Sequence, residues 1–246
     1  MRKLIFIVMI APASLTAQVS LTPFVGLNST KLTESYSGYA KGGNYGIFGV
    51  EVEGRIKPKP YSSFYLSLVS GLSYLPNGFS YSSSFPLGST GYSARSTSIQ
   101  TRYWQVPLLV RLNWKPFPLV EDWRIFLGAG ISYNTLTYAH IAEQSTYVTL
   151  SFFYYPPTGA YYQDSRDITN LAVKNSLFER FELGMKFRRV QVTWRLSFST
   201  QDMYFKGLEK DWQVPESNSF YLNSHNSRGI TKEKYSEIVF GWRFFN

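Results

Sequence analysis

Hydrophobic and polar residues alternate with a period of two along most of this chain. Val110, Leu112 and Trp114, for example, alternate with Arg111 and Asn113. Successive side chains of a β-strand point to opposite faces, so this period predicts strands. The pattern marks eight stretches: 19–28, 46–57, 63–75, 99–114, 123–136, 177–188, 190–200 and 235–245.

The lengths of these stretches and of the links between them favour a barrel that crosses a membrane. Each stretch has about ten residues or more, whereas strands of ordinary globular proteins most often have about five or six. The links alternate between long (29–45, 76–98, 137–176, 201–234) and short (58–62, 115–122, a tight turn near Arg189). Outer-membrane barrels have long external loops and short periplasmic turns. We therefore predict an all-β fold: an eight-stranded antiparallel up-and-down transmembrane β-barrel.

The polar faces of the predicted strands carry full charges of both signs, which indicates which face is inside. A soluble ligand-carrying barrel would turn its apolar side chains inward, whereas a membrane barrel turns them toward lipid. An eight-stranded lumen is narrow enough for side chains to fill, and opposed charges there can pair. The predicted lumen charge network consists of Glu51, Glu53, Arg55, Arg111, Arg180, Glu182, Lys186, Arg195, Glu237 and Arg243.

Aromatic residues occur near the ends of several predicted strands. In membrane barrels such rings form girdles at the two interfaces. The predicted lipid-facing and girdle residues are Trp104, Trp114, Trp123, Tyr133, Trp194 and Trp242. The alternative is a secreted β-sandwich with an aromatic-rich core, in which the charged faces would meet solvent and the links need not alternate in length.

The first residues have the pattern of a secretory signal peptide. Arg2 and Lys3 precede a short apolar run, and small residues up to Ala17 follow it. We expect a signal peptide at 1–17 and a barrel at 18–246; the alternative is a buried N-terminal strand or helix. Loss of Arg2 and Lys3 would lower the formal net charge from +9 by two, to +7. For an exported chain, outer-membrane lipid or lipopolysaccharide is the expected counter-charge, and nucleic acid is not.

The composition gives little support for catalysis. Absence of cysteine removes thiolate nucleophiles and thiolate metal sites, and the two histidines leave little for a His-based metal site. His140 and His225 fall in predicted external loops, but neither stands in a recognisable catalytic motif. We expect no catalytic residues, no cofactor and no metal, and hence no enzyme.

Four segments resemble PorT-like outer-membrane β-barrel proteins, which are common in Bacteroidetes. The segment 103–113 (YWQVPLLVRLN) resembles the Pro-containing strand of that family, 24–28 (FVGLN) its first strand, 178–184 (FERFELG) a middle strand and 241–244 (GWRF) the closing strand. The resemblance spans nearly all of the chain after residue 17. It implies an eight-stranded outer-membrane barrel and little about activity, although one namesake member serves type IX protein secretion. Pro107 lacks an N–H for the ladder, and we expect a bulge or a local break in pairing there.

These patterns leave three hypotheses for function. The first is a structural or interaction barrel with a side-chain-filled lumen, whose external loops recognise a surface or secretion-machinery protein. The second is a porin-like protein: a small channel or a transporter of hydrophobic or small solutes. The third is a lipid-modifying enzyme. The aromatic segment 147–162 suits a recognition surface, although 148–155 could instead extend the strands as a hairpin above the membrane.

Overall fold

The fold was analysed in a computed structural model, which describes residues 19–32, 40–56, 62–86, 91–116, 123–149, 158–170, 174–200 and 233–244. Ten strands are present: β1 (Val19–Leu32), β2 (Ala40–Gly42), β3 (Asn44–Arg55), β4 (Phe64–Pro86), β5 (Gly91–Trp114), β6 (Trp123–Thr149), β7 (Thr158–Asp167), β8 (Asn175–Phe187), β9 (Val190–Ser199) and β10 (Glu233–Trp242). The predicted signal peptide lies outside the described residues. No helix in the described part of the chain is long and apolar enough to cross a membrane.

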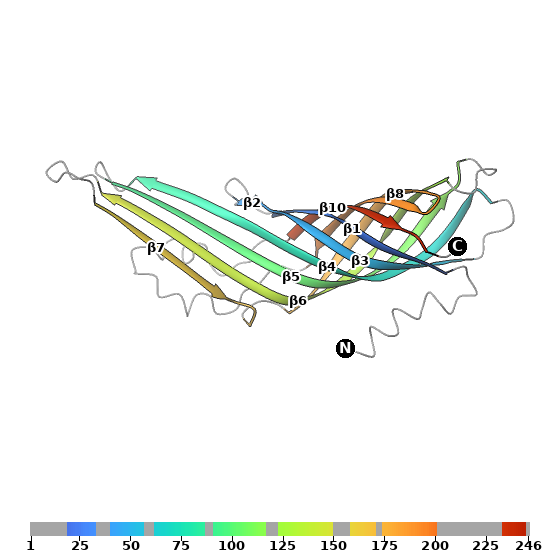
Figure 1. The fold of residues 1–246 in the computed structure, drawn as a ribbon, viewed down its shortest axis with the longest axis horizontal. Coiled ribbons are helices and arrows are strands. Elements are labelled where there is room, and N and C mark those ends of the chain that lie inside the picture. Colours follow the sequence, from blue (N-terminus) through green and yellow to red (C-terminus); the bar gives the residue numbers. More distant parts are fainter. Residues whose placement is uncertain are drawn as a thin grey trace.

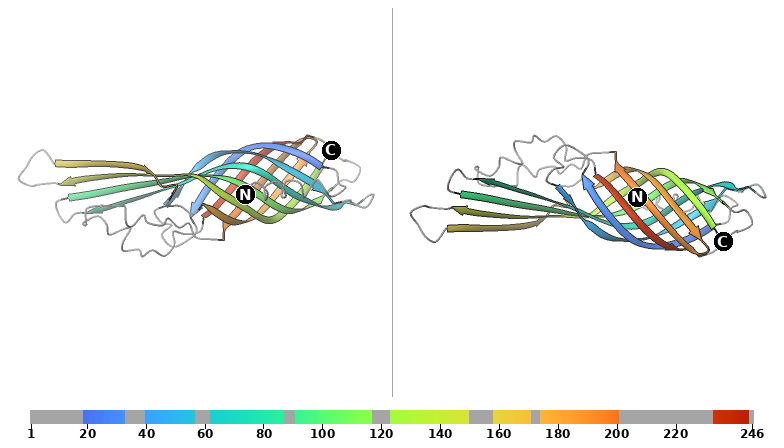
Figure 2. Two further views of the ribbon diagram at one scale, coloured as in Figure 1. Left: turned by 90° about the horizontal axis from the view of Figure 1, so that it is seen from below. Right: turned by 90° about the horizontal axis from the view of Figure 1, so that it is seen from above.

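Eight of the strands close into an antiparallel barrel, which confirms the predicted fold. The pairing runs β1–β3–β4–β5–β6–β8–β9–β10, and β10 returns to β1, where Val25 pairs with Phe240. Figure 2 shows these strands tilted around a common axis. The short connections gather at one end of the barrel, which we call the turn end. There β8 and β9 are joined by Arg188 and Arg189, and Arg188 has a positive φ of 52°.

At the opposite end, β4, β5 and β6 continue past the barrel, and β7 joins them by pairing with β6, which gives an open sheet (Figure 1). β6 pairs with β8 as far as Thr135 and with β7 from His140 onward. β4 and β5 stay paired out to Pro86 and Tyr92. We call this extension of β4, β5, β6 and β7 the projecting sheet. Much of 76–98 and 137–176, predicted as loops, is therefore strand, because serine-, threonine- and tyrosine-rich residues there continue the ladders beyond the apolar alternation that marked the barrel.

The ladder irregularities differ from the expected ones. Pro107 pairs with Ser132 in regular register on the β6 side, so the bulge considered there is wrong. The pairing with β4 is interrupted between Leu108 and Gln105, where proline offers no N–H, and this agrees with a local break. A register shift does occur nearby, between Arg102 and Tyr103, where β5 leaves the barrel.

Candidate functional site: the barrel lumen and its two ends

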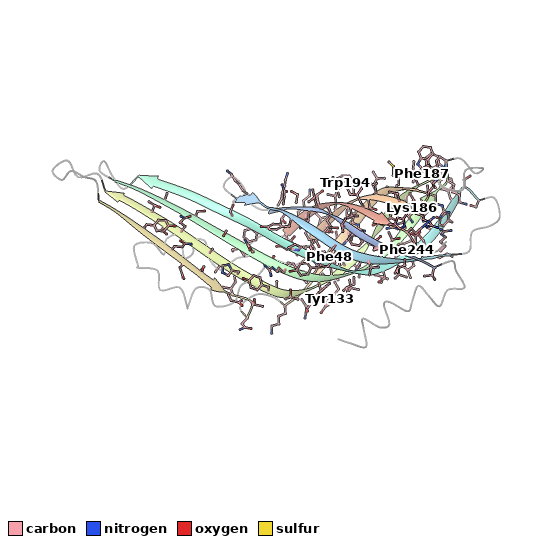
Figure 3. The ribbon with its side chains drawn as sticks, in the orientation of Figure 1. Phe48, Tyr133, Lys186, Phe187, Trp194 and Phe244 are labelled. Carbon is pink, nitrogen blue, oxygen red and sulfur yellow. The ribbon has the colours of Figure 1, made fainter. Side chains whose placement is uncertain are left out.

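The outside of the barrel is apolar on every strand. Leu27, Val110, Leu127, Leu183 and Phe240 are among the large apolar side chains that are exposed there. Soluble monomers seldom expose a continuous apolar surface larger than a few hundred Å². Figure 3 shows Phe187 and Trp194 pointing outward from the barrel. The apolar face of each ribbon is therefore the outer face.

The aromatic side chains lie at two levels on this outer face. Near the turn end, the rings of Phe64 and Trp114 are stacked 6.2 Å apart. Toward the projecting sheet, the Tyr74 ring lies 5.4 Å from that of Trp104 and 5.3 Å from that of Phe48. Ten residues of β5 separate the two tryptophans, about 33 Å of strand. Tilted by about 40°, this strand spans a height of about 25 Å, which matches the apolar band of membrane barrels.

The six residues predicted to face lipid or form girdles all point outward, at different heights. Trp123 and Trp242 lie near the turn end, where they pair with Phe187 and Val190, and Tyr133 lies opposite Val106 toward the projecting sheet. Trp194 differs, since it pairs with Leu183 and Ile238 halfway along the barrel. Its indole N–H donates to the Ser236 hydroxyl at 2.8 Å, which satisfies the donor away from water.

Inside the barrel, charged side chains from five strands form one buried network. Arg111 of β5 is at its centre: its Nε lies 2.6 Å from Glu182 Oε1, and its Nη1 and Nη2 lie 3.1 and 3.5 Å from Oε2 of Glu53 and of Glu51. Lys186 of β8 also binds Glu53. The guanidinium carbon of Arg111 is 4.1 Å from the centre of the Phe126 ring, so the cation also meets an aromatic face.

A second part of the network surrounds Arg195 of β9. This guanidinium binds Glu51 of β3 and lies 3.5 Å from Glu237 of β10 and 3.8 Å from Glu182 of β8. Arg180 adds a contact of 3.1 Å to Glu237. The network pairs four cations with four carboxylates: Arg111, Arg180, Lys186 and Arg195 with Glu51, Glu53, Glu182 and Glu237. Its formal charge is therefore zero.

One glycine provides the space for this network. Gly128 of β6 lies opposite Glu182 in the ladder. A Cβ at Gly128 would lie 2.5 Å from the Glu182 side chain, closer than nonbonded atoms tolerate. The absent side chain lets the Glu182 carboxylate turn across the lumen toward Arg111.

Polar side chains that the sequence did not assign to the network extend it toward the projecting sheet. Gln105 accepts a hydrogen bond from Arg180 and donates to the Tyr235 hydroxyl at 2.8 Å. Asn134 donates to the same hydroxyl at 3.0 Å. Gln105 and Asn134 stand on the polar faces of their strands, which was the available signal, but no local pattern indicates that they meet Tyr235 from distant strands.

Many of the buried side chains above Tyr235 are apolar. A buried cluster fills the top of the barrel and the base of the projecting sheet; it comprises Phe24, Ile47, Leu75, Phe79, Ile99, Tyr103, Leu136, Ala139, Ile141, Ile168, Phe178, Tyr235 and Val239. Buried polar side chains lie among this cluster as well: Asn28 and Thr30 hydrogen-bond to Asn77, and Glu233 is 1% exposed. Buried ion pairs thus lie toward the turn end, and a mixture of buried apolar and uncharged polar side chains with Glu233 lies toward the projecting sheet.

Two predicted network residues, Arg55 and Arg243, lie apart from the balanced network. Both are buried at the turn end of the lumen, at 8% and 6% exposure. Arg124, which was not predicted as part of the network, joins them there: its Nη1 donates to the Tyr65 hydroxyl at 3.0 Å. The sequence placed Arg124 on a polar strand face but gave no sign that it would meet two other arginines.

The histidines do not form a catalytic arrangement in the described structure. His140 lies on β6 in the projecting sheet, half-buried, with its ring stacked 6.1 Å from that of Tyr138. His225 lies outside the described residues. No group of three or more potential metal ligands is found within the described ranges.

A closed sheet that is apolar outside and charged inside defines this chain as a transmembrane β-barrel. No family model matches the chain, and no curated protein matches it. Among solved structures, the chain is similar to Ail, the attachment invasion locus protein of Yersinia pestis (10% identity, 92% of this chain and 99% of that chain, TM-score 0.32). It is also similar to the N-terminal β-barrel domain of Pseudomonas aeruginosa OprF (8% identity, 93% and 100% coverage, TM-score 0.31).

Proposed function

We propose that the protein is an outer-membrane anchor for a recognition surface, and that the projecting sheet is that surface. The observation that carries the proposal is the continuation of β4, β5 and β6 out of the barrel together with β7, as one hydrogen-bonded sheet. A preorganised sheet loses less conformational entropy on binding than a flexible loop. Exposed aromatic side chains such as Tyr161 offer rigid contact area.

The same proposal includes the membrane in which the protein lies and its orientation there. Closed barrels of this polarity belong to outer membranes, where short turns face the periplasm. The turn end is then periplasmic, the projecting sheet is external, and residues 1–17 act as the signal peptide. Lipopolysaccharide or other outer-membrane lipid surrounds the barrel, and the partner is a surface protein, with PorT-like barrels as the related family. The protein is not an enzyme in this proposal.

A shortened projecting sheet tests this function. The variant replaces 80–98 and 142–165 each with Asn-Gly, a two-residue hairpin turn. These cuts follow the observed register, in which Phe79 pairs with Ile99 and Ile141 with Arg166. We expect the shortened barrel to fold and insert as the full-length chain does, and to lose binding to an array of purified surface proteins and glycans. A control that replaces only the 87–90 link with Asn-Gly should keep binding. Equal binding by the shortened and full-length chains would contradict the proposal.

The filled lumen leads to a second expectation. Ion pairs and the apolar cluster occupy the interior, so the barrel should not conduct. In planar bilayers the full-length protein is expected to give no current above the leak of protein-free membranes. Discrete open-channel steps would favour the channel hypothesis over the proposed anchor.

A further inference from the structure

Three arginines lie at the turn end of the lumen, outside the balanced network. Arg55, Arg124 and Arg243 come from β3, from β6 and from just after β10, and all three face inward. The guanidinium carbons of Arg55 and Arg124 each lie 5.7 Å from the centre of the Tyr65 ring. Arg243 is close enough to both for their charges to act on it. Arg55 and Arg124 therefore flank Tyr65, and Arg243 lies within range of their charges. We call these three cations the arginine mouth.

Among the described residues, the carboxylate whose charge acts on the mouth is already bound. Glu53 is the acidic group whose charge acts on Arg243, but its Oε2 binds both Arg111 and Lys186. Lys186 itself lies directly opposite Arg124 in the β6–β8 ladder, so two cations occupy one cross-strand pair. Like charges placed opposite each other destabilise a sheet. Lys186 is balanced by Glu53, so this cross-strand pair supplies Arg124 with no counter-charge.

Two of these guanidinium groups keep unused donors despite their burial. Arg124 and Arg243 are 7% and 6% exposed. Arg124 donates through Nη1 to Tyr65, and Arg243 through Nη2 to the Arg188 carbonyl at 3.2 Å. Arg124 Nε and Arg243 Nη1 have no hydrogen-bond partner among the described residues. Buried donors, above all charged ones, are normally satisfied, so these nitrogens point to an acceptor that the described residues do not supply.

We propose that the arginine mouth binds a phosphate group. Guanidinium groups present planar pairs of donors that match phosphate oxygens. Cations from three strands approach from different directions, which suits a tetrahedral anion with oxygens on every side better than a flat carboxylate. The group reaches the mouth from the turn end and stops at the paired network above it. In the proposed orientation the phosphate comes from the periplasmic side, from a lipid headgroup or from a free phosphate.

Titration calorimetry on the full-length protein in a phosphate-free glycoside detergent tests the site. We expect saturable binding of inorganic phosphate at one site per chain, with a rise in the unfolding temperature as phosphate is added. Arg124→Gln should weaken the affinity by about 10-fold or more, because it removes a charge-assisted hydrogen bond. Arg243→Gln should act in the same direction and provides a second test if the first variant fails to fold. Circular dichroism checks folding.

The matched control is Arg189→Gln, which removes one exposed positive charge from the same end of the barrel. It should change the affinity by less than about twofold, since exposed charges are screened. Dihexanoyl phosphatidic acid then distinguishes the sources: binding about 10-fold tighter than that of inorganic phosphate assigns the site to a headgroup, and equal binding to the free ion.

Three results would overturn the proposal. One is the absence of saturable binding for both probes. Another is an equal loss in Arg189→Gln and Arg124→Gln, which would show a general charge effect. The third is binding that appears only when Glu121→Gln and Asp122→Asn are introduced together, because the acids of the chain itself would then fill the mouth. Failure of phosphate binding leaves the projecting sheet and its binding test unaffected.

Discussion

Replacing Arg111 with methionine is expected to lower the free energy of unfolding by about 3–5 kcal/mol. Arg111 contacts Glu51, Glu53 and Glu182, and its side chain is 1% exposed. Removing it leaves three carboxylates in a dry interior with too few cations. The measurement is urea-induced unfolding and refolding in lipid vesicles, followed by tryptophan fluorescence.

The control for this prediction is Arg102→Met. Arg102 is exposed on β5, where its guanidinium carbon lies 4.6 Å from the centre of the Tyr138 ring. An exposed cation–π contact is worth about 0.5–1 kcal/mol, so the loss should be small. If Arg111→Met and Arg102→Met had the same effect, the buried network would not stabilise the barrel.

Placing arginine at Leu183 is expected to cost about 2–4 kcal/mol in a bilayer, whereas arginine at Phe187 should cost about 0–1 kcal/mol. Both residues lie on the outer face of β8 and are similarly exposed, at 44% and 53%. Leu183 pairs with Leu127 and Trp194 halfway along the barrel, and Phe187 pairs with Trp123 beside the turn. The two positions therefore share an element and a face but lie at different depths in the membrane.

The same two variants can also be compared in detergent micelles instead of a bilayer. In detergent micelles, which adapt to the surface of the barrel, the gap between Leu183→Arg and Phe187→Arg should narrow. Refolding titrations in vesicles and in micelles would show this. Equal costs for the two variants in vesicles would argue against a bilayer around the outer face.

The barrel was predictable from the sequence because its signal is local. Alternation such as that from Trp104 to Trp114 fixes both the strand and the outward face, and a one-residue slip would bury the wrong side. The alternation of long and short links then gave the topology. A strand extension above the membrane was predicted only as an alternative for 148–155. The rest of the projecting sheet was predicted as loops, because its Ser- and Tyr-rich strands have no membrane to impose an apolar face.

The sequence predicted that charged side chains line the lumen, but it did not predict which of them contact each other. Every charge on a polar strand face must point into the barrel, so Arg111 and Glu182 could be placed there from the sequence. Which cation meets which carboxylate depends on the register between strands that are far apart in the chain. The separation of Arg55, Arg124 and Arg243 from the balanced pairs depends on their height along the barrel axis. The alternation of polar and apolar residues predicts the face on which a side chain lies but not this height.

β6 pairs with β8 in the barrel and with β7 beyond it. This change of partner affects how far the projecting sheet extends from the membrane. β5 has 24 residues, about 80 Å of extended chain, and beyond the register shift between Arg102 and Tyr103 it pairs with β6 in one regular ladder. The height of the tip above the lipid headgroups therefore depends on the number of paired residues in this ladder. Inserting two residues in each of the facing strands would raise the tip by about 7 Å and keep every side chain on its own face. During evolution the projecting sheet could therefore lengthen or shorten in steps of two residues per strand while the barrel stays the same.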